Sequence, residues 1–179
     1  MDDPQYLAKQ PVSPLAGSYG HPLHPILATV PIGAWTGSLV FDIASHLVDD
    51  PDFLAKGSLW LIGVGVIGAL AAAAAGFLDL LAIPPGTPAF RTALVHMSLN
   101  LAVTLAYAIG FGWRMGDVTG AVDLGQIALS AVSLACLAVS GFLGGKLAYR
   151  YGVRVADERT QAEGFARTPR PHTDQGGTP

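Results

Sequence analysis

The chain has 179 residues, of which 51% are hydrophobic and 13% are charged, and its formal net charge is -3 at pH 7. The apolar residues form long runs with the charges placed between them, which is typical of a membrane protein and not of a soluble domain. This charge gives no indication of nucleic-acid binding. The single cysteine, Cys136, lies inside an apolar run, so it can form neither an internal disulfide nor an iron–sulfur cluster, and we interpret it as a packing residue.

Residues 1–20 are polar and punctuated by Pro4, Pro11 and Pro14, which predicts a mostly extended arm. Asp2 and Asp3 stand where a signal peptide would carry positive charge, and no cleavage-site pattern follows. We therefore expect the first hydrophobic helix to remain in the mature protein.

Four apolar segments follow, at about residues 24–47, 58–82, 90–112 and 123–147. Each has more than about 20 residues, enough to cross a hydrocarbon core of about 30 Å at about 1.5 Å per residue. The predicted fold is an all-α membrane protein, a four-transmembrane-helix bundle over residues 21–155. Residues 156–179 are polar and rich in Pro, Gly and Thr, so we expect a disordered tail.

An even number of crossings places both termini on one side of the membrane, together with the turn between the second and third spans. Lys and Arg are concentrated on that side, which predicts that both termini are cytoplasmic. The residues on that side are Lys9, Arg91, Lys146, Arg150, Arg154, Arg159, Arg167 and Arg170, against Lys56 and Arg114 on the other.

Small and polar residues recur at helical spacing within the spans, which indicates close helix packing. In the first span the heptad count puts Trp35 and Asp42 on one face, with Asp42 more than one turn inside the boundary. Asp42 and His46 are one turn apart, so they could form an ion pair, part of a surface network with Asp123 and Gln126, or one station of a proton path.

The motif GHPLHP, at residues 20–25, places two histidines at the start of the first span. The four-span topology brings a larger set of polar side chains to the same side of the membrane. We expect His96 to lie one to two turns deeper than His24, and both to belong to one cluster. The cluster comprises His21, His24, Asp79, Arg91, His96 and Asn100.

Ionisable side chains inside a bilayer are costly, so these residues are functional candidates. Histidines that face one another across a helical bundle can hold a haem iron or another transition metal. In that interpretation His24 and His96 are the ligands, and His21, Asp79 and Asn100 support or replace them. The alternative is structural: His21 and His24 cap the first helix, and His96 is a buried hydrogen-bond partner of a residue such as Asp79.

Several of these patches resemble a family of bacterial four-helix membrane proteins known as domain of unknown function 2231. They are GHPLHP with PIG and Trp35 downstream, Asp42, the turn from Gly76 to Asp79, Arg91 with His96 and Asn100, and the segment GFLGGKLAYRYGVRV at residues 141–155. The resemblance implies a multi-pass protein of the bacterial inner membrane. Some relatives are fused to Rieske iron–sulfur domains, which implies electron transfer, and here any redox partner would be a separate polypeptide.

Three functions remain open from the sequence. The first is a redox component that binds b-type haem or a transition metal in the bilayer and that meets a separate redox protein. The second is a non-catalytic assembly or accessory subunit, and the third is a proton or small-solute conduit through Asp42 and Asp79. A homo-oligomer is compatible with each. No nucleotide-binding loop, nucleophile with its base, or HExxH motif indicates an enzyme.

Overall fold

The computed structural model describes residues 3–116 and 118–166. Four long helices make up most of it, and each is long and apolar enough to cross a membrane, which confirms the predicted four-helix membrane fold. They are α2 (Leu23–Ala44), α3 (Asp52–Leu81), α4 (Pro88–Arg114) and α5 (Leu124–Gly145), and α5 continues into the π-helical turn η2 (Lys146–Arg150).

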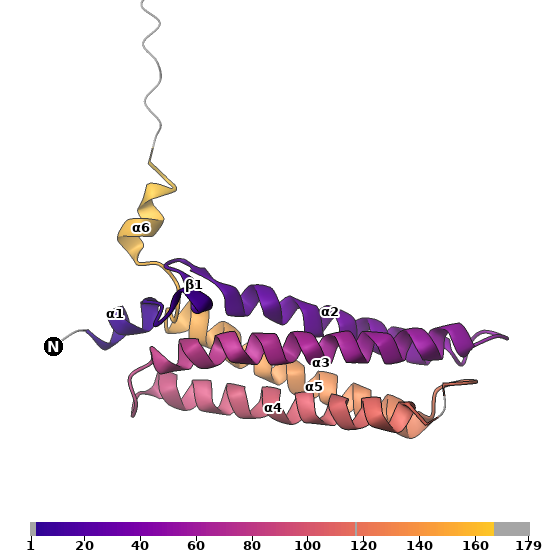
Figure 1. The fold of residues 1–179 in the computed structure, drawn as a ribbon. Helices are drawn as coiled ribbons and strands as arrows, with labels where there is room; N and C mark the ends of the chain where they lie inside the picture. The colour runs from indigo at the N-terminus through magenta and orange to yellow at the C-terminus, as the bar shows by residue number, and fades with distance from the viewer. Residues whose placement is uncertain (1–2, 117, 167–179) are drawn as a thin grey trace, which may run out of the picture.

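The long helices lie side by side in one bundle (Figure 1). In this bundle α2 packs along α3 and α4 packs along α5, while α3 also packs against α4 and α5 contacts α2. Each helix therefore has two neighbours, and α2 lies diagonally opposite α4. Side chains that point inward from α2 and α4 consequently meet at the centre of the bundle.

Local chemistry explains where the helices begin. Thr87 caps α4 by accepting a hydrogen bond from the Phe90 backbone N–H at 3.1 Å. Asp123 caps α5 by accepting from Gly125 and Gln126. The helix α3 begins at Asp52, earlier than the sequence predicts, because an acidic residue in the first turn is favourable at the positive end of the helix dipole.

The shorter elements gather at one end of the bundle (Figure 1). They are α1 (Pro4–Lys9), the 3-10 turn η1 (Pro14–Ala16), the antiparallel pair β1 (Gly17–Ser18) and β2 (His21–Pro22), and α6 (Glu158–Glu163). The arm predicted to be extended therefore contains helical turns, and a short helix lies in the segment predicted to be disordered. Residues 167–179 of that segment lie outside the described residues.

Arg154 ties these terminal segments to the bundle. The residue is 3% exposed, and its Nε lies 2.8 Å from Oδ1 of Asp79 near the end of α3. The same guanidinium donates hydrogen bonds to the carbonyls of Ala16 and Gly17 at 3.0 and 3.1 Å, and the Arg154 backbone N–H donates to the carbonyl of Ala8. One buried cation thus joins the N-terminal arm and the segment after η2 to α3.

Removing the Asp79 carboxylate should release this end of the molecule. We expect Asp79→Asn to lower the free energy of local opening by about 2 kcal/mol, because the ion pair with a buried guanidinium is lost. Hydrogen exchange of the backbone amides in residues 4–19 should become faster, while amides in the middle of α3 should not change. Arg159→Gln, at an exposed position, is the control, and an equal change in that variant would contradict the anchoring role.

Candidate functional site

His24 lies in the first turn of α2, and its ring turns inward against α3. Its Nδ1 lies 2.8 Å from the backbone carbonyl of Ala72. Since a carbonyl oxygen can only accept, Nδ1 carries the proton, and in the neutral ring Nε2 keeps its lone pair. Gly76, one turn further along α3, makes this position possible, because a Cβ there would lie 2.8 Å from Nδ1 of His24.

His96 repeats this arrangement on the other pair of helices. Its Nδ1 lies 2.8 Å from the backbone carbonyl of Ser140 on α5, and a Cβ at Gly144 would lie 3.1 Å from its ring. The Ser140 hydroxyl also lies 2.9 Å from Nδ1. Asn100 Nδ2 lies 3.1 Å from Nε2 of His96 and donates to that nitrogen, so the same Nδ1–H tautomer is present.

The two imidazoles meet at the centre of the bundle. Their ring centroids are 6.1 Å apart and their planes are at 89°, so an edge of one ring faces the other. Their separation limits the difference in depth between the two rings to about one helical turn, the lower end of the predicted one to two turns. Counted from the start of each helix, His96 is further in, since α4 begins with Pro88, about two turns before His96, whereas only Leu23 precedes His24 in α2.

The remaining predicted residues divide into two groups. Asn100 joins the histidine pair, and Asp79 is close enough to His24 to interact with it electrostatically, although its ion pair is with Arg154. His21 and Arg91 are exposed and stay outside the pair. The β1–β2 turn directs His21 away from the bundle, where its Nδ1 contacts the Tyr19 carbonyl at 3.3 Å.

An aromatic pair lies further along the same axis. Trp35 and Tyr107 stack with ring centroids 4.1 Å apart and planes at 8°, and both side chains are almost fully buried. Trp35 Nε1 donates to the carbonyl of Ile62, and Tyr107 Oη donates to the carbonyl of Ser130 at 3.2 Å. Around this stack lies an apolar layer that includes the buried Ile62, Ala69 and Val103 and the partly buried Leu134, Cys136 and Leu137.

A buried ion pair ends the series at the face opposite the termini. Asp42 is 0% exposed and Arg114 is 3% exposed, and they form a bidentate pair with N–O distances of 2.7 and 2.8 Å. Ser58 donates to the same carboxylate. Asp42 is therefore paired with Arg114 and not with His46, whose Nε2 donates instead to the carbonyl of Val122 at 2.8 Å.

These three central pairs occupy equivalent positions in two repeats. Each partner on α4 follows its partner on α2 by 72 residues: His24 and His96, Trp35 and Tyr107, Asp42 and Arg114. The α2–α3 hairpin and the α4–α5 hairpin run in the same sense, so a pseudo-twofold axis along the bundle relates them. All three pairs lie on that axis.

The hydrogen-bond acceptors on α3 and α5 repeat in the same way, with a spacing of 68 residues. The carbonyls of Ala72 and Ser140 accept hydrogen bonds from the two histidines. The carbonyls of Ile62 and Ser130 accept hydrogen bonds from Trp35 and Tyr107. Each position on α5 follows its counterpart on α3 by 68 residues, and so do the glycines behind the imidazoles, Gly76 and Gly144. The repeat therefore extends to the bonds that orient the central side chains.

Hydropathy reasoning did not identify Arg114 as a functional candidate, because a charged residue at the end of an apolar run is normally assigned to a loop. The spacing of 72 residues between the GHPLHP motif and His96 is the signal that could have found it. The residue 72 positions after Asp42 is Arg114. Arg154 has no counterpart in the repeat, and its role follows only from tertiary contacts.

The fold and the buried polar axis define a multi-pass, four-helix membrane protein. The chain belongs to the family of predicted membrane proteins designated DUF2231, whose model matches residues 20–157. No curated protein and no solved structure matches the chain significantly. The matched range begins at Gly20 and contains all three central pairs.

Proposed function

We propose that the chain is a redox component of the membrane in which His24 and His96 bind a transition-metal centre, with haem iron as the favoured form. The observation that carries the proposal is the pair of facing imidazoles, 6.1 Å apart between ring centroids. A metal ion bound by one nitrogen of each ring, with bonds of about 2.1 Å, would require the ring centres to lie within about 6.5 Å of each other, and the observed separation meets this condition.

The tautomers of the two rings also suit metal binding. Histidines that bind metals commonly donate their other N–H to a backbone carbonyl, which fixes the ring and raises its basicity. Ala72 and Ser140 provide those carbonyls, and the Nε2 atoms are then the ligating nitrogens. Asn100 would release Nε2 of His96 and keep its second hydrogen bond, to the His96 carbonyl at 3.0 Å.

The number of protein donors favours haem over a bare ion. The described residues contain no group of three or more His, Cys, Asp or Glu side chains placed to hold a metal. A closed site for a bare ion usually needs four protein ligands, whereas a haem iron needs two axial ligands. When bound, haem supplies one-electron exchange, and the protein residues hold the imidazoles in place while lipid and the apolar layer exclude water.

The proposal also covers the location of the chain and its partners. We place the chain in the bacterial inner membrane with both termini in the cytoplasm, and the concentration of Lys and Arg at the end that carries the termini supports this orientation. An electron carrier needs a donor and an acceptor, and we infer that a separate redox protein is one of them. A homo-oligomer remains compatible with the exposed apolar surface of the bundle, which the lipid bilayer covers.

One observation favours a second candidate, a non-catalytic assembly or accessory subunit. Each histidine bonds to a neighbouring helix, so the two rings also fix the register of α2 on α3 and of α4 on α5. The apolar layer around Trp35 and Tyr107 separates the histidines from the Asp42–Arg114 pair, which disfavours the conduit through Asp42 and Asp79.

An absorption spectrum and metal analysis of the detergent-purified chain from haem-replete cells distinguish the two candidates. We expect a stoichiometric haem or metal that His24→Asn and His96→Asn remove. Asparagine keeps a donor near the place of Nδ1 and has no second ring nitrogen, so these variants should keep their helical content. His21→Asn should keep the bound group. A colourless wild-type protein free of stoichiometric metal would reject the redox proposal and leave the structural one.

A further inference from the structure

An open groove lies between the N-terminal arm and the turn that joins α3 to α4. Its volume is about 390 Å³, within the range of about 300–1,000 Å³ that is usual for small-molecule sites. Leu7, Pro11 and Val12 of the arm line one side, and residues 81–85 line the other. Gln10 has the only polar side chain among the lining residues. The groove therefore suits an apolar ligand.

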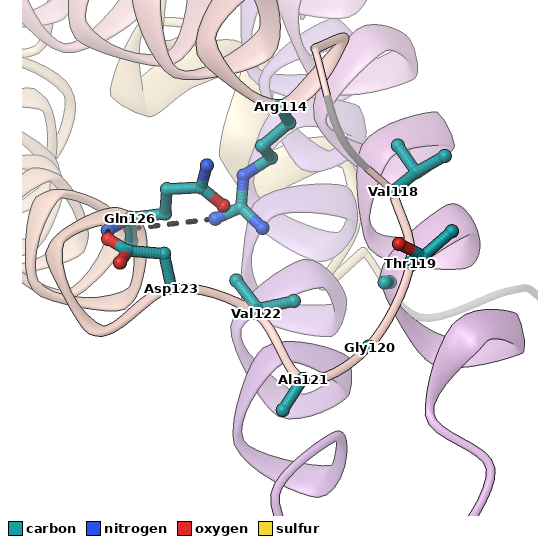
Figure 2. Close-up of a pocket in the computed structure, with 9 residues that line it drawn as sticks. Arg114, Val118, Thr119, Gly120, Ala121, Val122, Asp123 and Gln126 are labelled. Atoms are coloured by element: carbon teal, nitrogen blue, oxygen red, sulfur yellow. Dashed lines mark hydrogen bonds between the residues drawn. The ribbon is translucent and has the colours of Figure 1, made fainter.

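The cavity at the opposite end of the bundle has a different character (Figure 2). Its volume is about 110 Å³, and its lining includes the polar side chains of Arg114, Asp123 and Gln126. A hydrocarbon ligand there would separate these polar groups from water, which is costly. The two ends of the bundle therefore differ, and an apolar ligand is expected at the end that carries the termini.

The length of α3 places the groove at the membrane surface. The helix has 30 residues and is about 45 Å long, which matches the roughly 40–45 Å thickness of a bilayer with its headgroup regions. Leu81 is the last residue of α3, and it also lines the groove. The groove therefore lies at the level of the phospholipid headgroups and the adjoining acyl carbons.

A stripe of exposed apolar side chains on α3 leads into the groove. These side chains recur at steps of three, seven and four residues, which is the spacing of one helix face. They are Ile67, Leu70, Phe77 and Leu81, and each is more than half exposed. On a membrane-spanning helix, lipid acyl chains cover such a face. The lipid-facing surface of α3 is therefore continuous with the groove, because Leu81 belongs to both.

The N-terminal arm has the composition of an interfacial segment. Its exposed apolar side chains are Tyr6, Leu7, Val12 and Leu15. Residues 3–16 contain only two charged side chains, Asp3 and Lys9, and Lys9 is buried. An apolar surface of this kind is unfavourable in water, and tyrosine is enriched where the membrane meets water. The arm is therefore suited to lie along the bilayer surface.

We propose that the groove binds an acyl chain of a phospholipid from the leaflet on the side of the termini, and that the arm lies in the interfacial region beside it. The contacts of Arg154 with Ala16 and Asp79 hold the arm next to the end of α3. The bound chain continues the lipid shell around α3 and covers the apolar side chains of the arm. This proposal is independent of the metal-binding proposal, because the groove and the histidine pair share no residue.

Spin labels on the full-length protein in vesicles of phosphatidylethanolamine and phosphatidylglycerol test the position of the arm. In a Cys136→Ser background, a label at Val12→Cys reports on the groove, while labels at Leu70→Cys and Arg159→Cys report on lipid and water. Oxygen concentrates in hydrocarbon, whereas a water-soluble nickel chelate stays outside it. We expect the ratio of oxygen to nickel collision rates at Val12→Cys to exceed that at Arg159→Cys by about threefold or more.

Two results of this measurement would overturn the proposal. A collision ratio at Val12→Cys equal to that at Arg159→Cys would place the arm in water. Spin–spin broadening that disappears on dilution with unlabelled protein would show that a second copy of the chain, and not lipid, covers the groove.

A phospholipid with a photoreactive diazirine in its acyl chain tests the binding itself. It should cross-link to peptides that contain residues 7–12 or 81–85. Val12→Asp should lower this cross-linking on the order of fivefold, because a carboxylate on the groove wall disfavours hydrocarbon. Leu7→Asp, on the same wall, is the second variant if Val12→Asp does not fold. Val12→Leu is the matched control and should keep the cross-link, and equal cross-linking of the aspartate and leucine variants would contradict the proposal.

Discussion

Arg114→Leu should lower the free energy of unfolding by about 3–5 kcal/mol, because it leaves the Asp42 carboxylate buried without its counter-ion. Reversible unfolding in mixed detergent micelles, followed by circular dichroism, measures the change. The control is Lys56→Leu, which breaks the exposed Lys56–Asp52 pair of 3.7 Å. Its effect should stay within about 0.5 kcal/mol, since exposed ion pairs contribute little.

Exchanging the two charges provides a sharper version of this prediction. Asp42 and Arg114 are equivalent positions of the two repeats. The Ser58 hydroxyl on α3 contacts both side chains, and Arg114 also contacts Ser130 and the Gln126 carbonyl on α5. The double variant Asp42→Arg with Arg114→Asp should therefore recover most of the stability that each single variant loses. A double variant as unstable as the sum of the singles would show that the surroundings of the two positions are not equivalent.

Gly65→Ala should lower the free energy of unfolding by about 3 kcal/mol, because it disturbs the aromatic stack at the middle of the bundle. A Cβ at this position would clash with the indole nitrogen of Trp35, and the fixed backbone of α3 leaves the ring no room beside Tyr107. Overpacking a dense core usually costs about 1–3 kcal/mol, and here the bond from Trp35 to the Ile62 carbonyl is lost as well.

The same unfolding assay measures this loss, and the near-ultraviolet circular dichroism of the aromatic side chains reports whether the stack is broken. Gly33→Ala is the matched control, because it lies in α2 with nothing within 4 Å of the added methyl group. That variant should be neutral or slightly more stable, as expected for alanine in a helix. Equal losses in both variants would mean that glycine itself, and not the space for Trp35, is required.

The sequence predicts the fold well because a transmembrane helix is a long apolar run, and its signal does not depend on distant contacts. The heptad count also places Trp35 and Asp42 on one face of the first span, and both are buried in α2. Inward-facing positions are thus readable from spacing alone.

Partners across the bundle are less predictable. The residue opposite Asp42 depends on which helices are diagonal and how far each extends, and neither property is visible in one helix. His21 illustrates the same limit, because a local turn directs it outward although it is only three residues from His24. The repeat of 72 residues would have supplied the missing information, since equivalent residues that both point toward a central axis lie next to one another.

The central claim is that the equivalent imidazoles of His24 and His96 lie side by side at the centre of the bundle, each with its proton on Nδ1 and an unprotonated Nε2. Nitrogen-15 magnetic resonance of histidine-labelled protein tests it directly, because protonated and unprotonated ring nitrogens have different shifts. We expect His24 and His96 to carry the proton on Nδ1 and His46 to carry it on Nε2, as their carbonyl partners require. The two Nε2 signals of His24 and His96 should shift together when the metal centre is added. Proton-bearing Nε2 atoms on those two rings, or a shift in only one of them, would contradict the account.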